Sequence, residues 1–467
     1  MKTKRTTTIT RRTLLKQASA LSVAGAATPF VVNLAAMGEA AAATAADYKA
    51  LVCVFLYGGN DYANTLVPYD NNQYAIYQAQ RPGLTYAQSA LAATALTPSL
   101  PLPGGAQYAL APELAPLLPV FQAGAMGVLL NVGALVEPTT KAQYQAGSVR
   151  LPPKLLSHND QQSYWQASSP EGAVSGWGGR IADLLQSGNG TATLTCINVS
   201  GNAVFLTGRS AVQYSVTPAG PIALGTRTSL QGSTAAAALL QSLLTGGGPH
   251  EFQAALGSIG TRALDLYDQV SAALTQAPAT STVFPAAADP QSTLGAQLQF
   301  VARMISVGSQ LGAKRQVFFV STSRFDTHDG LATLHPTLLT NLGNALRAFY
   351  DTTVELGVAS QVTTFTASDF GRALTANNDG TDHGWGSVHF VLGGSVNGGR
   401  YYGINPTLAN GGPDDIGQGR LIPTLSVDQY AATLASWFGV SASDLATVVP
   451  NIANYAGSAL GTNVGFV

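Results

Sequence analysis

Short apolar runs that alternate with helical segments are the feature that most constrains the fold of this 467-residue chain. The runs, rich in Val, Leu, Ile and Phe, lie at residues 50–57, 126–132, 194–199, 316–321, 362–366 and 389–392. Segments with helical periodicity lie between or after them, at residues 177–186, 293–308, 335–356 and 427–438. Continuous apolar strands alternating with helices are typical of a mostly parallel sheet covered on both faces. The sequence therefore predicts an α/β fold, with a mostly parallel sheet sandwiched by helices.

Residues 200–292 depart from this alternation. They are rich in Ala, Ser, Thr, Gly and Gln, and helical patterns lie at 234–244 and 249–274. We interpret this region as a helical insertion or cap on the core and not as a second domain with its own sheet. Because nothing resembling a linker divides the remainder, we predict one α/β domain over residues 46–467.

The first 45 residues carry the pattern of a twin-arginine export signal. Residues 1–17 contain six basic side chains and no acidic one, including Arg11-Arg12, and an Ala-rich apolar stretch follows at 18–36. The small residues at 40–46 supply a cleavage region, after Ala42 or Ala45. We predict a signal peptide over residues 1–45 and export of the folded protein to the periplasm or the extracellular space.

No stable membrane span is expected once the signal is cleaved. Thr28, Pro29 and Asn33 interrupt an apolar segment that is already close to the ~17-residue lower limit for a span. Without residues 1–45, 17 basic side chains stand against 23 acidic ones. A mildly acidic chain with no basic stripe argues against a nucleic-acid partner. Cys53 and Cys196 lie inside apolar runs and read as buried small hydrophobic residues, although a disulfide between them stays open.

Histidines and carboxylates concentrate between residues 324 and 389, where four of the six histidines lie in a chain with only 10% charged residues. This concentration predicts a metal site. In an open parallel sheet the active site lies at the carboxyl ends of the strands, so the residues that follow each predicted strand matter most.

The first predicted strand is followed by Gly58-Gly59-Asn60-Asp61. Glycines let the backbone turn tightly or approach a ligand closely, and Asp61 offers oxygen ligands. The alternative is an Asx turn that caps the next helix.

Two later predicted strands end in similar groups. Asp326 and His328 would face the same side of an extended segment and offer an oxygen and a nitrogen to a divalent ion. Asp369 follows the strand at 362–366 as a further ligand candidate, and Arg372 is placed to hold an anionic oxygen. The alternative for the second pair is a structural Asp369–Arg372 ion pair.

Two other segments supply candidates. His383 is a strong ligand candidate in the Gly-rich loop 380–386, whereas His389 falls within an apolar strand and reads as a buried core histidine. Ser157 precedes a helical pattern and is either an N-cap with Asp160 at the third helical position or a hydroxyl nucleophile at a helix N-terminus. His158 cannot easily activate its neighbour and would more readily reach a metal or the substrate.

An ordered set of motifs resembles a large exported bacterial family catalogued as domain of unknown function 1501. The motifs are Gly58-Gly-Asn-Asp61, Ser157-His158…Gln161…Trp165, Gly176-Trp177…Arg180, Phe325-Asp-Thr-His328, Ser368-Asp-Phe-Gly-Arg372 and Gly380-Thr-Asp-His-Gly384. The family is placed with the alkaline phosphatase and sulfatase superfamily. The resemblance implies an alkaline phosphatase-like α/β core and hydrolysis of phosphate or sulfate esters at a divalent-metal site.

The resemblance also implies roles for particular residues. It makes Asp61, Asp326, His328, Asp369 and His383 the metal ligands. It leaves the nucleophile unassigned, with Ser157 ahead of Thr65 as the candidate, and we expect Arg372 to neutralise charge on the transferred group. Either Ser368-Asp369 or Asp382-His383-Gly384 matches the superfamily's Asp-His-Gly motif, and both alignments cannot hold.

Mixed histidine and carboxylate ligation favours Zn or Mn. Because the resemblance implies ester hydrolysis, the expected partner is a small-molecule or polymer ester. The alternative function is a phosphatase-like scaffold that has lost catalysis and serves as an exported binding or assembly protein.

Overall fold

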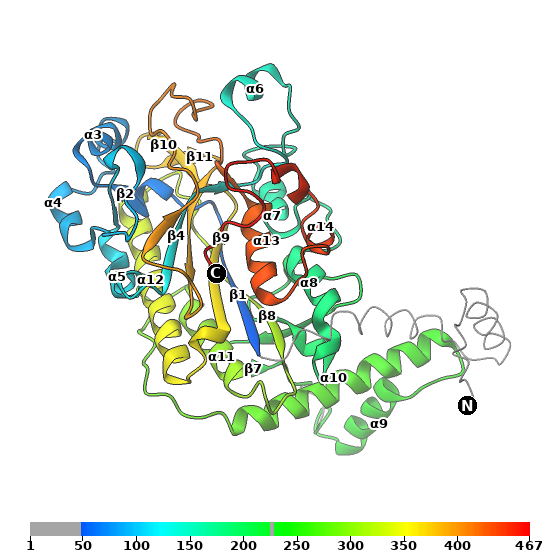
Figure 1. The fold of residues 1–467 in the computed structure, drawn as a ribbon. Coiled ribbons are helices and arrows are strands. Elements are labelled where there is room, and N and C mark those ends of the chain that lie inside the picture. The colour runs from blue at the N-terminus through cyan, green and yellow to red at the C-terminus, as the bar shows by residue number, and fades with distance from the viewer. Residues whose placement is uncertain (1–47, 225–227) are drawn as a thin grey trace, which may run out of the picture.

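The computed structural model describes residues 48–224 and 228–467 (Figure 1). The predicted signal peptide, residues 1–45, lies outside them. The strands of the main sheet are β1 (Lys49–Leu56), β4 (Met126–Gly133), β5 (Cys196–Asn198), β6 (Gln213–Thr217), β7 (Gly220–Pro221), β8 (Arg315–Thr322), β9 (Val362–Ser368), β12 (Ser387–Leu392), β13 (Arg400–Tyr402) and β14 (Leu425–Ser426). In this part of the chain they form a 10-stranded sheet in the order β13-β4-β12-β9-β1-β8-β5-β6-β7, with β14 beside β4.

Most strands of this sheet run in one direction. β1 pairs in parallel with both β8 and β9, and β5 continues the parallel arrangement to β6. β12 is reversed, because it pairs antiparallel with β4 and with β9. Each of the six predicted strands is present, and the predicted α/β class is confirmed.

Helices cover both faces of the sheet. α11 (Leu294–Ser306) and α12 (Leu331–Glu355) pack on one face, and α7 (His158–Ala167), α8 (Trp177–Leu185) and α13 (Val427–Phe438) pack on the other (Figure 1). β1 serves both faces, because alternate side chains of a strand point in opposite directions. Its Val52, Val54 and Leu56 join the α11–α12 core, whereas Leu51, Cys53 and Phe55 join the core under α8 and α13.

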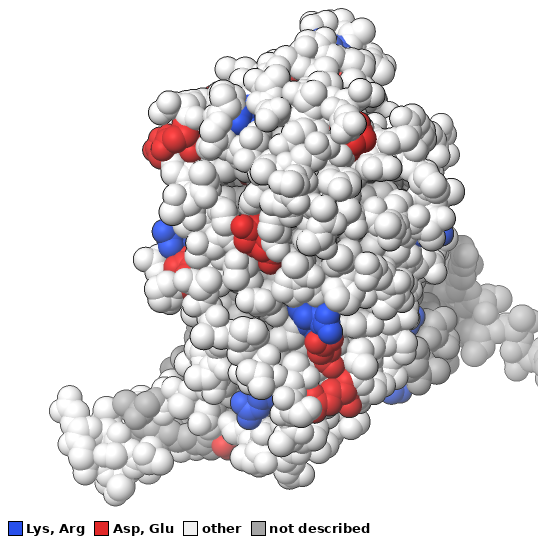
Figure 2. Space-filling model, turned by 90° about the vertical axis from the view of Figure 1, so that its left-hand side faces the viewer, with Lys and Arg blue, Asp and Glu red and all other residues white. Residues whose placement is uncertain are grey.

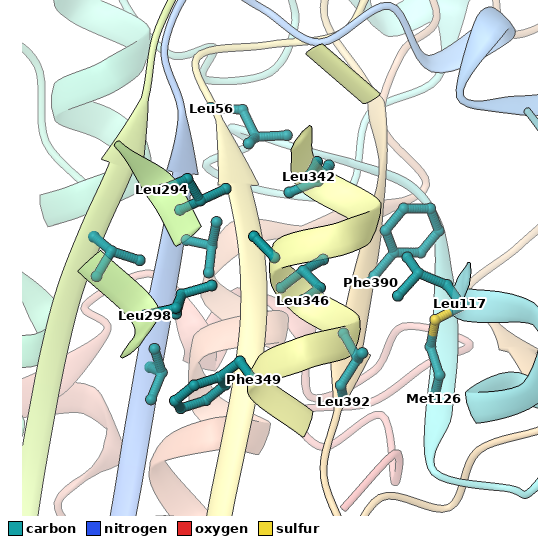
Figure 3. Close-up of a cluster of buried hydrophobic side chains, with 14 of the residues drawn as sticks. Leu56, Leu117, Met126, Leu294, Leu298, Leu342, Leu346, Phe349, Phe390 and Leu392 are labelled. Carbon is teal, nitrogen blue, oxygen red and sulfur yellow. The ribbon is translucent and has the colours of Figure 1, made fainter. Parts of the chain in front are cut away.

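The α11–α12 side of the sheet holds the larger core. Leu342, Leu346 and Phe349 on α12 point at Leu56 and Leu392 on the sheet, and Leu294 and Leu298 on α11 fill the space beside them (Figure 3). A fully buried side chain of this size stabilises the fold by about 1.5–3 kcal/mol. This packing fixes the strands, and the carboxyl ends of β1, β8 and β9 are thereby held side by side.

Smaller elements decorate the ends of the sheet. They are β2 (Leu66–Pro68) with β3 (Tyr108–Leu110), the hairpin β10 (Arg372–Ala376) and β11 (Thr381–His383), and the helices α3 (Asn71–Gln80), α4 (Gln88–Leu91), α5 (Leu118–Gln122), α6 (Lys141–Ala146) and α14 (Leu445–Val448). The β10–β11 hairpin lies above the upper end of the sheet in Figure 1. It brings His383 back over the strand that Asp369 follows.

The region between residues 200 and 292 contains the helices that its periodicity predicts, α9 (Thr234–Thr245) and α10 (Glu251–Thr275). It also adds β6 and β7 at one end of the main sheet, where β6 pairs in parallel with β5 and antiparallel with β7. The composition of this segment gave no sign of these strands.

Cys53 and Cys196 are both free and buried, and β8 lies between their strands. Burial raises the pKa of the Cys53 thiol well above its usual value. Within the described ranges, no helix combines the length and the apolar character needed to cross a bilayer.

Asp428, in the first turn of α13, is fully buried, and its Oδ2 has no hydrogen-bond partner in the described chain. Burial raises its pKa to about 6 from 3.8. The stability that the protonated carboxyl contributes is present below about pH 4 and is lost as the pH rises through 6. Asp428→Asn should thus raise the free energy of unfolding by roughly 1–3 kcal/mol above pH 7 and by little near pH 4. Urea unfolding at both pH values measures this, and a gain that does not depend on pH would contradict it.

Candidate metal centre

Three side chains converge above the carboxyl ends of the parallel strands. His158 begins α7, Asp326 follows β8, and His383 ends β11. One ligand atom from each lies within 4.8 Å of the others. His158 Nε2 is 3.3 Å from Asp326 Oδ2, and His383 Nε2 is 3.4 Å from Asp326 Oδ1. Two imidazoles and a carboxylate are ligands that Zn and similar divalent ions take.

Each of these imidazoles is held through its other nitrogen. His158 Nδ1 donates to Asp369 Oδ2 at 2.6 Å, and His383 Nδ1 donates to the Leu156 carbonyl at 2.7 Å. Both Nε2 atoms therefore face the cluster as acceptors when the rings are neutral. Metal-binding histidines usually have such a second partner, which fixes the tautomer and the ring orientation. His158 Nε2 is buried and makes no hydrogen bond to any described residue, so its lone pair is free to bind a cation.

Asp326 is positioned by a buried arginine. Arg372, at the start of β10, is fully buried and donates from Nη1 to Asp326 Oδ1 at 2.8 Å. Burial acts to raise the pKa of Asp326, but the hydrogen bond and charge of Arg372 outweigh it and hold the pKa below its usual value. The carboxylate is therefore charged and available as a ligand at neutral pH.

The remaining hydrogen bonds of Arg372 go to Gly58 and Thr381, including the Thr381 hydroxyl, which accepts from Nε. Nη1 donates to the Gly58 carbonyl, and Nε and Nη2 donate to the Thr381 carbonyl. The side chain thus holds three loops together and does not project into the site. The role that the sequence suggested for Arg372, binding an anionic group, does not fit this placement. The alternative of a structural arginine fits better, although its carboxylate partner is Asp326 and not Asp369.

His328 lies beside the three converging side chains. Its Nε2 is 3.1 Å from Asp326 Oδ1 and 2.8 Å from His383 Nε2. Because His383 Nδ1 is committed to Leu156, the two facing Nε2 atoms must share either a proton or a cation. His328 is about two-fifths exposed, which leaves it accessible to solvent and to a substrate.

Two residues near the cluster have strained backbones. Leu156, whose carbonyl holds His383, has φ of 71°, and Arg324, two residues before Asp326, has φ of 77°. A side-chain-bearing residue in this left-handed region costs about 1–2 kcal/mol. Such strain persists only where the surroundings impose it, and it is frequent at functional sites.

Gly58 lets the loop after β1 close on the site. Its φ is +116°, and a Cβ there would lie 2.3 Å from the Asp326 backbone nitrogen. Its N–H donates to Asp369 Oδ2 while its carbonyl accepts from Arg372. The close approach that glycine permits at this position is thus made to the protein's own ligand loop.

Asp369 is near the predicted location but has a different role. It is fully buried, and its Oδ2 accepts from His158, Gly58 and the Nε2 of Gln162. Its other oxygen has no partner among the described residues. Asp369 therefore orients His158 and contacts the three converging side chains only through that histidine.

Asp61 does not join the site. Its carboxylate forms a buried ion pair with Arg81 and accepts the Ala63 N–H, as the Asx-turn alternative expected. Both oxygens are thereby engaged, so we leave Asp61 out of the ligand set.

The two hydroxyl candidates are also occupied. Ser157 takes the N-cap position of α7, but its Oγ donates to Asp160 Oδ2 at 3.0 Å. Thr65 is fully buried, and its hydroxyl bonds to Asn60 and to the Asp61 carbonyl. His389 is buried in the core as expected, with a hydrogen bond to Thr366.

His158 was expected only to reach a metal or the substrate and was not among the predicted ligands, and Gln162 was not predicted at all. Their spacing was an available signal, because residues four apart lie on one face of a helix. Gln162 and His158 use that face of α7 to bind the same oxygen of Asp369.

Asp369→Asn removes the charge behind His158 and should weaken divalent-metal binding by about 10–100-fold, the usual effect of losing an outer partner. A competition titration with a chromophoric chelator measures this. Asp351→Asn, the same change in an ion pair on the surface of α12, is the control and should not alter the affinity. Equal affinities for the two variants would contradict the positioning role.

Comparisons with known proteins place the chain in context. A family model described as a protein of unknown function, DUF1501, matches residues 48–441. Among solved structures, the chain is similar to Ps i-CgsB in complex with k-i-k-neocarrahexaose, with 9% identity and a TM-score of 0.34, over 87% of this chain and 77% of that one. Another structure of Ps i-CgsB gives 11% identity, the same TM-score and the same coverage. No curated protein matches the sequence.

Proposed function

The chain belongs to the DUF1501 family of proteins of unknown function, and on that premise we propose that it is an exported metal-dependent hydrolase of phosphate or sulfate esters. The observation that carries the proposal is the convergence of His158, Asp326 and His383, with each imidazole fixed through its second nitrogen. Export as a folded protein rests on the basic residues and the apolar stretch of residues 1–45.

The proposed ligands are His158 Nε2, His383 Nε2 and an Asp326 oxygen. Nitrogen and oxygen donors together favour Zn or Mn. A divalent ion there supplies a Lewis acid that polarises an ester oxygen and lowers the pKa of a bound hydroxyl or water.

The protein's own residues prepare this chemistry. Asp369 and the Leu156 carbonyl hold the two imidazoles in the tautomer that presents Nε2, and Arg372 keeps Asp326 charged. Burial lowers the pKa of His383, which favours the neutral ring that a ligand needs. The hydrogen bond to Asp369 raises the pKa of His158, so a metal ion competes with a proton for that ring. His328 is the exposed group closest to the proposed ligands that can hold or deliver a proton to a leaving oxygen.

The nucleophile is proposed to be water and not Ser157. The Ser157 hydroxyl donates to Asp160. Among the described residues, no other base is hydrogen-bonded to this hydroxyl. Ser157→Ala should therefore leave hydrolysis within a few-fold of the wild type. Loss of activity together with loss of a trapped phosphoryl or sulfuryl enzyme would instead assign Ser157 as the nucleophile.

Hydrolysis is tested with a panel of phosphate monoesters, phosphate diesters and sulfate esters, small and polymeric. The protein is first dialysed against chelator and then assayed with Zn, with Mn and with neither. Activity that returns with one metal and disappears in His158→Ala supports the proposal. Activity that is indifferent to chelator and to His158→Ala would overturn it.

One observation favours a second function, an exported binding or assembly protein that has lost catalysis. The Nε and Nη1 donors of Arg372 bind groups within the protein, so Arg372 is not a free cation placed to neutralise a transferred anionic group. On this alternative the metal still binds with the wild-type ligands, but no ester in the panel is hydrolysed.

A further inference from the structure

The long helix α10 carries one apolar stripe that is only half used. Residues spaced alternately by four and three positions line one side of the helix, which is the spacing of a coiled-coil seam. They are Phe252, Leu256, Ile259, Ala263, Leu266, Val270 and Ala273.

The two halves of the stripe lie in different surroundings. Leu266, Val270 and Ala273 are buried in the main core or beside it. Phe252 is 81% exposed, and Leu256 and Ile259 are 57% and 53% exposed. In Figure 1, α10 runs along the lower edge of the molecule, and its first turns extend beyond the sheet together with α9. The stripe therefore continues from the core into solvent without a change in character.

α9 does not cover the exposed half of the stripe. It packs on another side of α10, at Gly257 and Gly260, where an added Cβ would lie within 3 Å of carbonyl oxygens at the end of α9. α9 itself adds Leu239 and Leu243, one turn apart and both more than three-fifths exposed. Five large apolar side chains thus gather on a projecting pair of helices with almost no core of its own.

The charge of this helix pair indicates what covers it. Residues 234–264 contain one glutamate, Glu251, and one arginine, Arg262. Helices that lie in a membrane surface are rich in Lys and Arg on their polar face, which this pair lacks. A charged protein partner would leave its own charges unpaired here. An uncharged apolar seam is complementary to a second copy of itself, and a two-fold axis pairs like with like.

We propose that the chain forms a two-fold dimer in which the exposed half of the α10 stripe packs antiparallel against the same half of a second copy. The C-terminal half of each α10 packs against the core of its own chain. Antiparallel pairing therefore places the two α/β cores at opposite ends of the helix pair, where they do not collide. Burying Phe252, Leu256, Ile259, Leu239 and Leu243 on both copies removes on the order of 1,000 Å² from water, which is about the minimum area of a specific interface. The proposal is independent of the metal centre.

The first test is the mass of the purified protein by sedimentation equilibrium over a hundredfold range of concentration. The wild type should be dimeric, and Leu256→Glu together with Ile259→Glu should be monomeric. Val174→Glu, which puts the same charge at an 86% exposed apolar position outside the helix pair, should remain dimeric. Unchanged circular dichroism shows that the double variant is folded. A monomeric wild type, or a double variant that stays dimeric, would overturn the proposal.

A second measurement fixes the geometry. With the axis near the middle of the exposed half, Leu256→Cys lies opposite itself and should give a disulfide-linked dimer on oxidation. Residue 252 of one copy then lies about two helical turns from residue 252 of the other copy, so Phe252→Cys should not give a disulfide-linked dimer. Cys53 and Cys196 are buried and do not interfere. Crosslinking of both variants would indicate parallel pairing, and crosslinking of neither would contradict the interface.

Discussion

Replacing His158 and His383 together by alanine is expected to abolish stable binding of a divalent ion. Each change removes one nitrogen of the three converging ligand atoms, so Asp326 is left with only His328 beside it. Loss of an outer partner alone costs up to about 100-fold in affinity, and loss of two direct ligands costs more. The measurement is metal content by elemental analysis after dialysis, with the dissociation constant from chelator competition.

The matched control for this double variant is His250→Ala. His250 is an exposed histidine that precedes α10, which lies at the lower end of the molecule in Figure 1, whereas the β10–β11 hairpin that carries His383 lies at the upper end. Its removal should leave metal content unchanged. If the double variant retains a full equivalent of metal, the ligand set is wrong. If His250→Ala loses metal as well, the binding is not specific to the cluster.

Arg81→Met is expected to lower the free energy of unfolding by about 3–5 kcal/mol, because it leaves the Asp61 carboxylate buried without its countercharge. Both side chains of this ion pair are fully buried. Arg81 also donates to the carbonyls of Ala373 and Leu374, so the change loosens the β10 strand from α3. Urea unfolding, monitored by circular dichroism, measures the loss.

The double variant Arg81→Met with Asp61→Asn separates the charge effect from lost packing. Removing the unpaired charge should restore much of the stability, and a double variant as unstable as Arg81→Met would show that packing dominates. Asp61→Asn alone also tests the placement of Asp61. It should retain the wild-type metal content, and loss of metal would return Asp61 to the ligand set.

Much of the fold follows from local sequence patterns. The six apolar runs became strands because continuous burial on both faces demands side chains such as those of Val52 and Phe55 on one strand. The direction of β12 could not be predicted, since an apolar run reads the same in both directions. Strand β6 was also missed, because most of its residues are only partly buried and carry little apolar signal.

The site was predicted in part, for a physical reason. Asp326 and His383 stand at strand ends, where local sequence already indicates chemistry. The partner of each polar group is a long-range property that local pattern does not contain. Asp61 forms an ion pair with Arg81, and Asp369 binds His158, which is 211 positions away in the sequence. His158 was weighed only as a group able to reach a metal, because the capping pattern at Ser157 explained the segment without it.

The central claim is that His158, Asp326 and His383 hold a divalent ion, and the metal content of the protein purified from its natural host tests it most directly. The protein is purified without chelator or affinity metal and analysed by inductively coupled plasma mass spectrometry. We expect at least about one equivalent of Zn or Mn per chain, in keeping with a site of two imidazoles and a carboxylate. The claim would be contradicted if the protein contains less than one equivalent of metal and if adding Zn or Mn without chelator does not raise that content.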